Sequence, residues 1–257
     1  MKAILCVGGT DPTGGAGLTL DARVCAVLGY HPLTVATCVI VQDADRVRRV
    51  VPLNVAHILA QLAAAVDTIK PVAVKISVLP TDEAIEALAE FIEQRGLTNI
   101  VGDPVFLARN GTPLTPSPPE SEAWSQKIAP RCTVVTINVK EAEILSGSKV
   151  RTVKEAEGAA KKISRALKTA VVVKGGHLPR EGAVDVLAEG SKVKRFPGER
   201  LKVKVHGAGC AFSAALACGL AEGLALQEAV RRAKEFVTQA LKRAKTPEGA
   251  THALLIP

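Results

Sequence analysis

The stretch Val203-Lys204-Val205-His206-Gly207-Ala208-Gly209-Cys210, followed by Ala211-Phe212-Ser213-Ala214-Ala215-Leu216, decides how the rest of the chain is interpreted. A β-branched run stops at a glycine-rich turn, and an alanine-rich apolar sequence typical of a buried helix begins at once. Such a turn leaves the first N–H groups of the helix uncovered, and these donors together with the helix dipole can bind an anion. Cys210 lies in the same first turn, where the dipole is expected to favour thiolate over thiol. The alternative interpretation is a tight strand-to-helix turn with a buried, inert cysteine.

Outward from this turn, short apolar runs alternate with helical patterns along almost the whole chain. Strands are predicted at residues 3–7, 33–41, 72–76, 99–101, 133–136 and 170–173, which are nearly continuously apolar, as in strands covered on both faces. Helices are predicted at residues 16–28, 55–69, 82–95, 121–128, 153–167, 210–222 and 226–244. A hairpin is predicted from residues 183–187 and 192–196 around Glu189-Gly190-Ser191. Alternation of this kind predicts an α/β fold with a mostly parallel central sheet and helices on both faces.

Composition limits the class of protein. The 257 residues are 47% hydrophobic and contain no linker-like stretch, so we expect a single domain over residues 1–257. No segment approaches ~20 consecutive apolar residues, which argues against a membrane partner. The first nine residues suit an opening buried strand better than a signal peptide, so a cytoplasmic location is expected.

The net charge of +8 raises the question of a nucleic-acid partner. Aromatic residues make up only 3% of the chain, and Lys and Arg are scattered along the predicted helices. Because single-strand binding relies on aromatic stacking platforms, no nucleic-acid partner is expected. A basic surface also suits anionic phosphate ligands.

The six cysteines show no C-x-x-C pair and no metal-finger spacing, which leaves open whether any of them are bridged.

Polar and glycine clusters follow most of the predicted strands, at the sheet edge where ligands bind in folds of this type. In chain order they are Gly8-Gly9-Thr10-Asp11 with Gly14-Gly15-Ala16-Gly17 and Asp21; Gln42-Asp43; Ser77; Asp103-Pro104; Asn138 with Glu141; and Lys174-Gly175-Gly176-His177. The first cluster fits neither a Walker loop nor G-x-G-x-x-G. Each cluster alone is more often a cap or a loop, but six at one edge, closed by the Gly-Ala-Gly-Cys turn, favour a binding site.

The residue types at this edge suggest phosphoryl chemistry. Asp103 and Glu141 could hold Mg²⁺ through water, although helix capping is an equally simple role for Glu141. Lys174 leaves an apolar strand into glycines and could meet a phosphate as a point charge, or be an ordinary strand-end lysine. His177 and His206 are interpreted as loop histidines that satisfy backbone carbonyls, since no pair has metal-ligand spacing.

Taken together, these ordered motifs make the chain resemble the hydroxymethylpyrimidine/phosphomethylpyrimidine kinases of thiamine biosynthesis, which belong to the ribokinase-like superfamily. The resemblance runs from Gly8 to about Gln239 and includes Val74-Lys75-Ile76, Asp103-Pro104-Val105 and Val173-Lys174-Gly175-Gly176-His177 as well as the Gly-Ala-Gly-Cys turn. It implies a three-layer αβα fold and an ATP- and Mg²⁺-dependent kinase. Such a kinase would phosphorylate 4-amino-5-hydroxymethyl-2-methylpyrimidine and then its monophosphate. A homodimer is also suggested by this resemblance.

The resemblance also implies roles for individual residues. Cys210 falls on the catalytic base, and Gly207, Ala208 and Gly209 fall on the anion hole that stabilises charge on the transferred group. Lys174 would contact the ATP phosphates with Asn138 and Glu141 on the nucleotide side, and Asp103 with Glu141 would organise Mg²⁺. The substrate side would consist of Gly9, Asp11, Asp21, Gln42 and Val78, with Val41 beside them.

Several positions depart from the family pattern. Ala208 stands where Thr is usual, and Ile137 replaces Pro before Asn138. Ser77-Val78 replaces Gly-Met, and Val41-Gln42-Asp43-Ala44 replaces Ala-Gln-Asn-Thr. These changes alter the expected pocket and leave two alternatives open: a pyridoxal or pyridoxine kinase of the same superfamily, and a non-catalytic pyrimidine- or nucleotide-binding sensor.

Overall fold

The protein is described by a computed structural model that covers residues 1–43, 46–108, 112–115, 122–176, 178, 182–201, 203, 205–248 and 253–257. Within these residues a nine-stranded sheet has the order β3-β2-β1-β4-β5-β6-β7-β8-β9. The strands are β1 (Ala3–Thr10), β2 (His31–Gln42), β3 (Val47–Pro52), β4 (Ala73–Ile76), β5 (Ile100–Gly102), β6 (Val134–Asn138), β7 (Ala170–Lys174), β8 (Asp185–Glu189) and β9 (Lys192–Phe196). The six strands from β2 to β7 are parallel, and β3, β8 and β9 add antiparallel margins.

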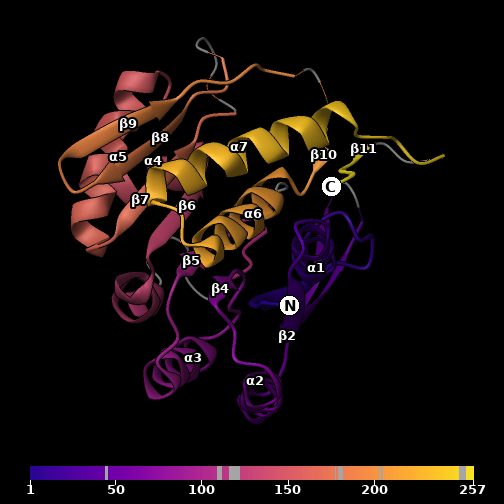
Figure 1. Ribbon diagram of the computed structural model, residues 1–257. Helices are drawn as coiled ribbons and strands as arrows, with labels where there is room; N and C mark the ends of the chain where they lie inside the picture. The colour runs from indigo at the N-terminus through magenta and orange to yellow at the C-terminus, as the bar shows by residue number, and fades with distance from the viewer. Residues whose placement is uncertain are drawn as a thin grey trace.

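Helices cover both faces of this sheet, so the predicted three-layer αβα fold is confirmed (Figure 1). One face carries α1 (Gly17–Val27), α6 (Ala208–Glu222) and α7 (Leu226–Lys242), with α6 and α7 side by side. The other face carries α2 (Val55–Thr68), α3 (Asp82–Arg95), α4 (Val139–Ser146) and α5 (Val153–Leu167).

The central strands are apolar on both faces because each face has its own core. In β1, Leu5 and Val7 point into the core under α2 and α3, whereas Ile4 and Cys6 point into the core under α1 and α6. The predicted strands and helices are therefore present, with ends that differ by at most three residues. The helix predicted at 121–128 begins with a residue that lies outside the described part, and its Trp124–Ile128 portion is a π-helical turn.

Four elements were not predicted from the sequence. Strand β3 carries Arg48 and Arg49 on an edge and so lacks an apolar run. Helix α4 is eight residues long, too short for a clear helical period. Strands β10 (Val205–His206) and β11 (Ala253–Leu254) are two residues each and pair with one another across the chain, and Leu254 also forms a bridge with Lys245. The β-branched run before the glycine turn is thus only partly a strand.

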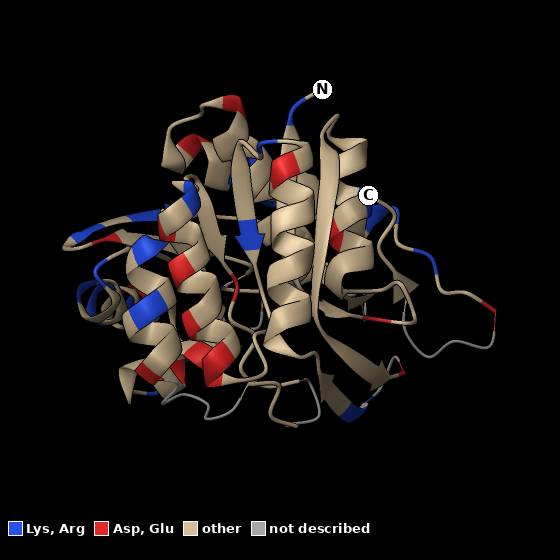
Figure 2. Cartoon of the chain, turned by 90° about the horizontal axis from the view of Figure 1, so that it is seen from below, with Lys and Arg blue, Asp and Glu red and all other residues tan. Residues whose placement is uncertain are grey.

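Surface charges are mixed rather than separated by sign. Basic and acidic residues are interspersed along the helices in Figure 2. Several form ion pairs, such as Arg232 with Glu222 and Arg195 with Glu157. In the part of the chain that the structure describes, no helix has the length and apolar character needed to cross a membrane.

Gly175, which follows β7, provides a test of this packing. A Cβ atom there would lie 1.8 Å from the carbonyl oxygen of Val184, whereas a Cβ at the next residue, Gly176, would meet nothing within 4 Å. We expect Gly175→Ala to lower the free energy of unfolding by about 1–3 kcal/mol because backbone must move. Gly176→Ala should change it by less than about 0.5 kcal/mol. Urea unfolding of the two variants measures the difference, and equal stabilities would contradict this account.

Candidate active site

The turn before α6 is held in place by contact with the loop after β1. Gly207 has φ +92°, and a Cβ at this position would lie 1.9 Å from the carbonyl oxygen of Gly15. Both the positive φ and this close approach require glycine. Gly207 provides no side-chain cap for α6, so the N–H groups of the first turn, including those of Ala208 and Gly209, begin the helix without one. The predicted anion-binding turn therefore has the expected backbone geometry.

A second helix begins at the same place. Gly17, the first residue of α1, has φ +57°, and a Cβ there would lie 2.6 Å from the carbonyl oxygen of Gly9. Its backbone N–H donates a hydrogen bond to the sulfur of Cys210. Cys210 thus lies between the N-terminal ends of α1 and α6. From the sequence, only the start of α6 was predicted to lie near Cys210, and the start of α1 was not.

The expectation that Cys210 favours the thiolate is wrong for the protein without ligands. Burial raises the pKa of the thiol to about 11. The ammonium of Lys75 and the Gly17 N–H act in the opposite direction, but the carboxylates of Asp21 and Asp103 add to the effect of burial. The helix dipoles are therefore outweighed, and Cys210 is a protonated thiol at neutral pH.

Asp103, directly after β5, is the centre of a buried polar cluster. Its Oδ1 accepts hydrogen bonds from Lys174 Nζ at 2.8 Å and Thr136 Oγ1 at 3.0 Å, and its Oδ2 accepts one from Ser213 Oγ at 2.9 Å. Burial raises the pKa of Asp103, but the charges of Lys174 and Lys75 outweigh burial and hold it below its usual range. Asp103 is therefore an ionised carboxylate at neutral pH.

Lys174, at the end of β7, connects this cluster to the glycine turn. Its Nζ would lie 3.3 Å from a Cβ at Gly209, so the absence of a side chain there lets the ammonium approach the start of α6. The side chain is 15% exposed, so part of it reaches the surface at this edge of the sheet. A positive charge next to an uncapped helix N-terminus favours a phosphate group.

Glu141 has the capping role that the sequence left open, and it also belongs to the site. Its Oε2 accepts from the backbone N–H of Asn138 at 2.8 Å, while Asn138 Oδ1 accepts from the N–H of Glu141 at 3.0 Å, a capping box at the start of α4. Burial raises the pKa of Glu141 to about 7, Lys174 lowers it, and the nearby Asp103 carboxylate raises it again. A cap alone would not need this buried position.

The residues at this edge fit a magnesium ion. Asp103 and Glu141 are two buried carboxylates that repel one another, and the single ammonium of Lys174 faces both. A divalent cation would supply the missing positive charge. Both oxygens of Asp103 already accept hydrogen bonds, which suits an ion that keeps several of its own waters. Among the residues described, no group of three or more His, Cys, Asp or Glu side chains could hold a metal alone, so phosphates would complete the ligand set.

Asp11 and Gln42, two of the predicted substrate contacts, are neighbours. The side chain of Gln42 donates to Asp11, as do the N–H and hydroxyl of Thr13 at 2.9 and 2.8 Å. His206 Nε2 lies 3.1 Å from Asp11 Oδ2, so the interpretation of His206 as a partner of backbone carbonyls is wrong. Burial raises the pKa of Asp11, but these partners outweigh burial and hold it well below its usual range. His177 lies outside the described residues.

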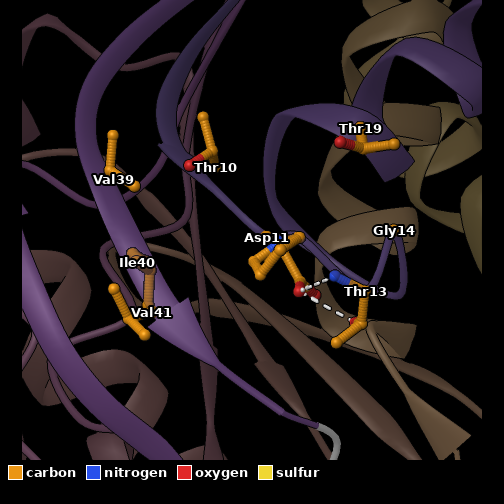
Figure 3. A pocket seen from close by; sticks show the side chains of 9 residues that line it. Thr10, Asp11, Thr13, Gly14, Thr19, Val39, Ile40 and Val41 are labelled. Atoms are coloured by element: carbon orange, nitrogen blue, oxygen red, sulfur yellow. Dashed lines mark hydrogen bonds between the residues drawn. The ribbon is translucent and has the colours of Figure 1, made fainter.

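An open pocket of about 580 Å³ lies between β2 and the loop that precedes α1 (Figure 3). Its walls are Thr10, Asp11, Pro12, Thr13, Gly14, Thr19, Val39, Ile40 and Val41. Val39 and Val41 are more than 40% exposed, so this part of β2 offers an apolar wall to solvent. Of the residues predicted for the substrate side, Asp11 and Val41 line the pocket. It adjoins the glycine turn through Gly15 but is not lined by Cys210 or Lys174.

The other predicted substrate residues lie deeper. Gly9 packs against Ile40 and Cys38 of β2, with a Cβ position only 2.6 Å from Ile40 Cδ1. Val78 is 5% exposed and belongs to a small apolar cluster with Cys38 and Ile40. Asp21 is fully buried and is bonded through Oδ2 to Lys75 Nζ at 2.7 Å, so it lies behind the pocket rather than on its wall.

Sequence reasoning assigned no role to Thr136, Ser213 or Lys75, although Lys75 belongs to one of the motifs on which the resemblance rests. Ser213 follows Cys210 by three residues on α6, so helical spacing could have placed it on the same face. Thr136 is one of two polar residues in the otherwise apolar β6. Lys75 interrupts an apolar strand with a charge, which is a signal for a buried partner.

Comparison with known proteins shows the family to which the chain belongs. Residues 11–254 match the sequence model of the phosphomethylpyrimidine kinase family. A hydroxymethylpyrimidine/phosphomethylpyrimidine kinase of Rhizobium meliloti is 36% identical over 248 residues, covering 95% of this chain and 92% of that protein. A pyridoxine kinase of Bacillus subtilis is 36% identical over 247 residues, covering 94% and 91%. The structure of Bacillus subtilis pyridoxal kinase with ADP superposes with a TM-score of 0.88 at 35% identity, covering 99% and 96%.

The family match and the three-layer fold shared with these relatives define a ribokinase-like phosphotransferase that uses ATP. Because the family match covers nearly the whole chain, and relatives at 36% identity align over more than nine-tenths of it, this chain belongs to the phosphomethylpyrimidine kinase family.

The raised pKa of Glu141 predicts a change of stability with pH. A folded-state pKa raised from 4.5 to about 7 gives stability that is full below pH 4.5 and is lost as the pH rises through 7. Glu141→Gln keeps a cap acceptor without the charge. Relative to wild type, the variant should therefore gain about 2–3 kcal/mol in free energy of unfolding between pH 5 and pH 8, without Mg²⁺ or nucleotide.

The matched control is Glu155, which closes the same kind of capping box at the exposed start of α5. The backbone N–H of Arg151 holds the pKa of Glu155 below its usual value, so its contribution has the opposite sign. That contribution is complete above pH 4.5, so Glu155→Gln should show almost no change in stability relative to wild type between pH 5 and pH 8. Urea unfolding at both pH values measures the two effects, and an equal gain in both variants would contradict this account of Glu141.

Proposed function

We propose that this kinase transfers the γ-phosphoryl group of ATP to the hydroxymethyl group of 4-amino-5-hydroxymethyl-2-methylpyrimidine, and then phosphorylates the resulting monophosphate. The observation that supports this most is the position of Cys210 between the first turns of α1 and α6, beside the Lys174–Asp103 pair. Membership of the phosphomethylpyrimidine kinase family supports the pyrimidine as the acceptor.

In this proposal the chain acts mainly through positioning and charge, as expected for a loose phosphoryl transition state. The N–H groups of Gly207, Ala208 and Gly209 would face the transferred group, where replacement of the family's Thr by Ala208 removes a hydroxyl but no N–H. Lys174 would neutralise the ATP phosphates, with Asn138 fixing the start of α4 beside them. A bound Mg²⁺, held by Asp103 and Glu141, would offset the negative charge of the phosphates.

On the substrate side, Gln42 and Asp11 would hydrogen-bond the ring, and Gly9 and Val78 would shape the adjoining wall. Cys210 would accept the proton of the hydroxymethyl group as its oxygen bonds to phosphorus.

We take residues 1–257 as one catalytic domain and expect a cytoplasmic homodimer. The exposed valines Val39 and Val41 on β2 support a self-association face, and sedimentation velocity tests it.

A second candidate is a pyridoxal or pyridoxine kinase. It is favoured by the pyridoxine kinase of Bacillus subtilis, which is as similar to this chain as the pyrimidine kinases are. Both acceptors carry a hydroxymethyl group on an aromatic ring, so the catalytic turn would act in the same way on either. Gln42, retained in this chain, supports the pyrimidine.

Substrate preference is tested by kcat/KM for hydroxymethylpyrimidine, its monophosphate and pyridoxal, measured through ADP release with saturating ATP and Mg²⁺. We expect both pyrimidine substrates to exceed pyridoxal by at least about tenfold, the discrimination that one or two ring contacts supply. A higher kcat/KM for pyridoxal would replace the first candidate by the second. Ligand binding without turnover of any of the three would support the sensor.

The proposed role of Cys210 predicts the effect of its removal. Cys210→Ala should lower kcat at least about 100-fold, because general bases contribute 10²–10⁴, and should leave ATP binding nearly unchanged. Cys132→Ala is the matched control, since that thiol is buried in the core on the other face of the sheet, which also contains Trp124. Steady-state kinetics with calorimetric titration of nucleotide separates the two effects. Lost ATP affinity in Cys210→Ala would contradict the role of base.

A further inference from the structure

The most unusual polar feature of the interior is the ion pair between Lys75 on β4 and Asp21 on α1. Both side chains are fully buried, and Nζ and Oδ2 are 2.7 Å apart. Asp21 Oδ1 has no hydrogen-bond partner among the described residues. A buried ion pair with an unsatisfied oxygen is weak evidence that the pair stabilises the fold. Apolar residues of similar size in the same place often give an equal or higher free energy of unfolding. The pair therefore calls for a functional explanation.

Its position relates it to the glycine turn. Side chains alternate along β4, so Lys75 points to the same face as Ala73, which lies in the core under α1 and α6. Asp21 reaches this ammonium from α1, whose first N–H donates to Cys210. The α6 helix, which carries Cys210 in its first turn, packs on β4 and on α1. The ammonium therefore lies beneath the cysteine, enclosed by the same three elements.

We propose that Lys75, held by Asp21, is a positioning residue whose buried positive charge stabilises the thiolate of Cys210. The inference rests on the proposed function, in which Cys210 is the base. The thiol first releases its proton to solvent, and the thiolate then takes the proton of the acceptor hydroxyl as the oxygen–phosphorus bond forms and the bond from phosphorus to ADP breaks. The sulfur ends as a thiol, ready to release that proton to solvent.

The other charged groups around Cys210 do not stabilise its thiolate as Lys75 does. Asp21 and Asp103 oppose the thiolate, and their effect adds to that of burial. Lys174 faces the same cluster, but its ammonium is bonded to Asp103 and is partly exposed toward the turn, where phosphates would engage it. The Gly17 N–H supplies only a dipole. Lys75 is the largest influence favouring the thiolate, and the carboxylate of Asp21 keeps its pKa raised despite burial.

The thiol itself provides the test. Of the six cysteines, Cys210 alone is partly exposed, and the other five are buried. Alkylation of the native protein by iodoacetamide, followed by mass spectrometry from pH 7 to pH 10 with Cys210→Ala as the blank, therefore reports the thiolate fraction of Cys210. This readout needs neither substrate nor turnover.

Lys75→Met retains much of the shape of the side chain and removes its charge, whereas Lys75→Arg retains the charge and changes the shape. We expect Lys75→Met to alkylate Cys210 at least about tenfold more slowly at pH 9, since one pKa unit is a factor of ten in thiolate below the midpoint. The rising limb of its kcat profile should move to higher pH by at least about one unit, with the KM for ATP unchanged. Lys75→Arg should stay within about threefold of wild type in alkylation.

Removal of one partner of a buried pair can prevent folding. The double variant Asp21→Asn/Lys75→Met removes both charges and should fold, as checked by circular dichroism. It should also alkylate more slowly than wild type, because Lys75 outweighs Asp21 at the sulfur. The inference would be overturned if the folded Lys75→Met and double variants alkylated at the wild-type rate, or if Lys75→Met and Lys75→Arg slowed alkylation equally.

The two proposals fail in different ways. If Cys210→Ala retains turnover, the cysteine is not the base and the proposed mechanism falls, whatever the alkylation shows. If Lys75→Met loses turnover while its alkylation profile matches wild type, the kinase assignment stands and the inference about Lys75 falls.

Discussion

The carboxylate of Asp103 joins the parts of the molecule on which the site depends. It lies just after β5 and accepts hydrogen bonds from β7 through Lys174, from β6 through Thr136 and from α6 through Ser213. Each donor comes from a different element, so this one buried anion fixes the glycine turn relative to the strand ends. A buried carboxylate is tolerated only with such partners, and this requirement orders the cluster.

The electrostatic balance of the site follows from that arrangement. Burial raises the pKa of Glu141 to about 7 and that of Cys210 to about 11, because the interior disfavours any charge that is not offset. Glu141 is therefore partly protonated and Cys210 fully protonated at neutral pH, whereas Asp103 is ionised. Positive charge favours the ionised forms: Lys174 lowers the pKa of Glu141 and Lys75 lowers that of Cys210, so a bound cation would shift both groups in the same direction.

Much of the fold was predictable because the strands and helices of each layer have characteristic local sequence patterns. Buried parallel strands are continuously apolar, and the α3 and α5 helices carry capping residues at Thr81 and Thr152. The β3 strand was not predicted because it lacks an apolar run, and α4 was not predicted because it is too short for a clear helical period. The two-residue strands β10 and β11 were not predicted because each pairs with a segment distant in the sequence. The polar strand ends were predicted to meet at one edge, and Asp103, Lys174 and the glycine turn do so.

The sequence by itself determined the order of strands and helices, the glycine turn before α6 and the set of polar residues at the sheet edge, because these depend on local spacing. The tertiary structure decided what those residues touch. It placed Asp21 against Lys75 behind the pocket, His206 against Asp11, and the first N–H of α1 against Cys210. It also reversed the expected pKa shift of the cysteine, because burial depends on every element packed around a group and is not encoded in its neighbours along the chain.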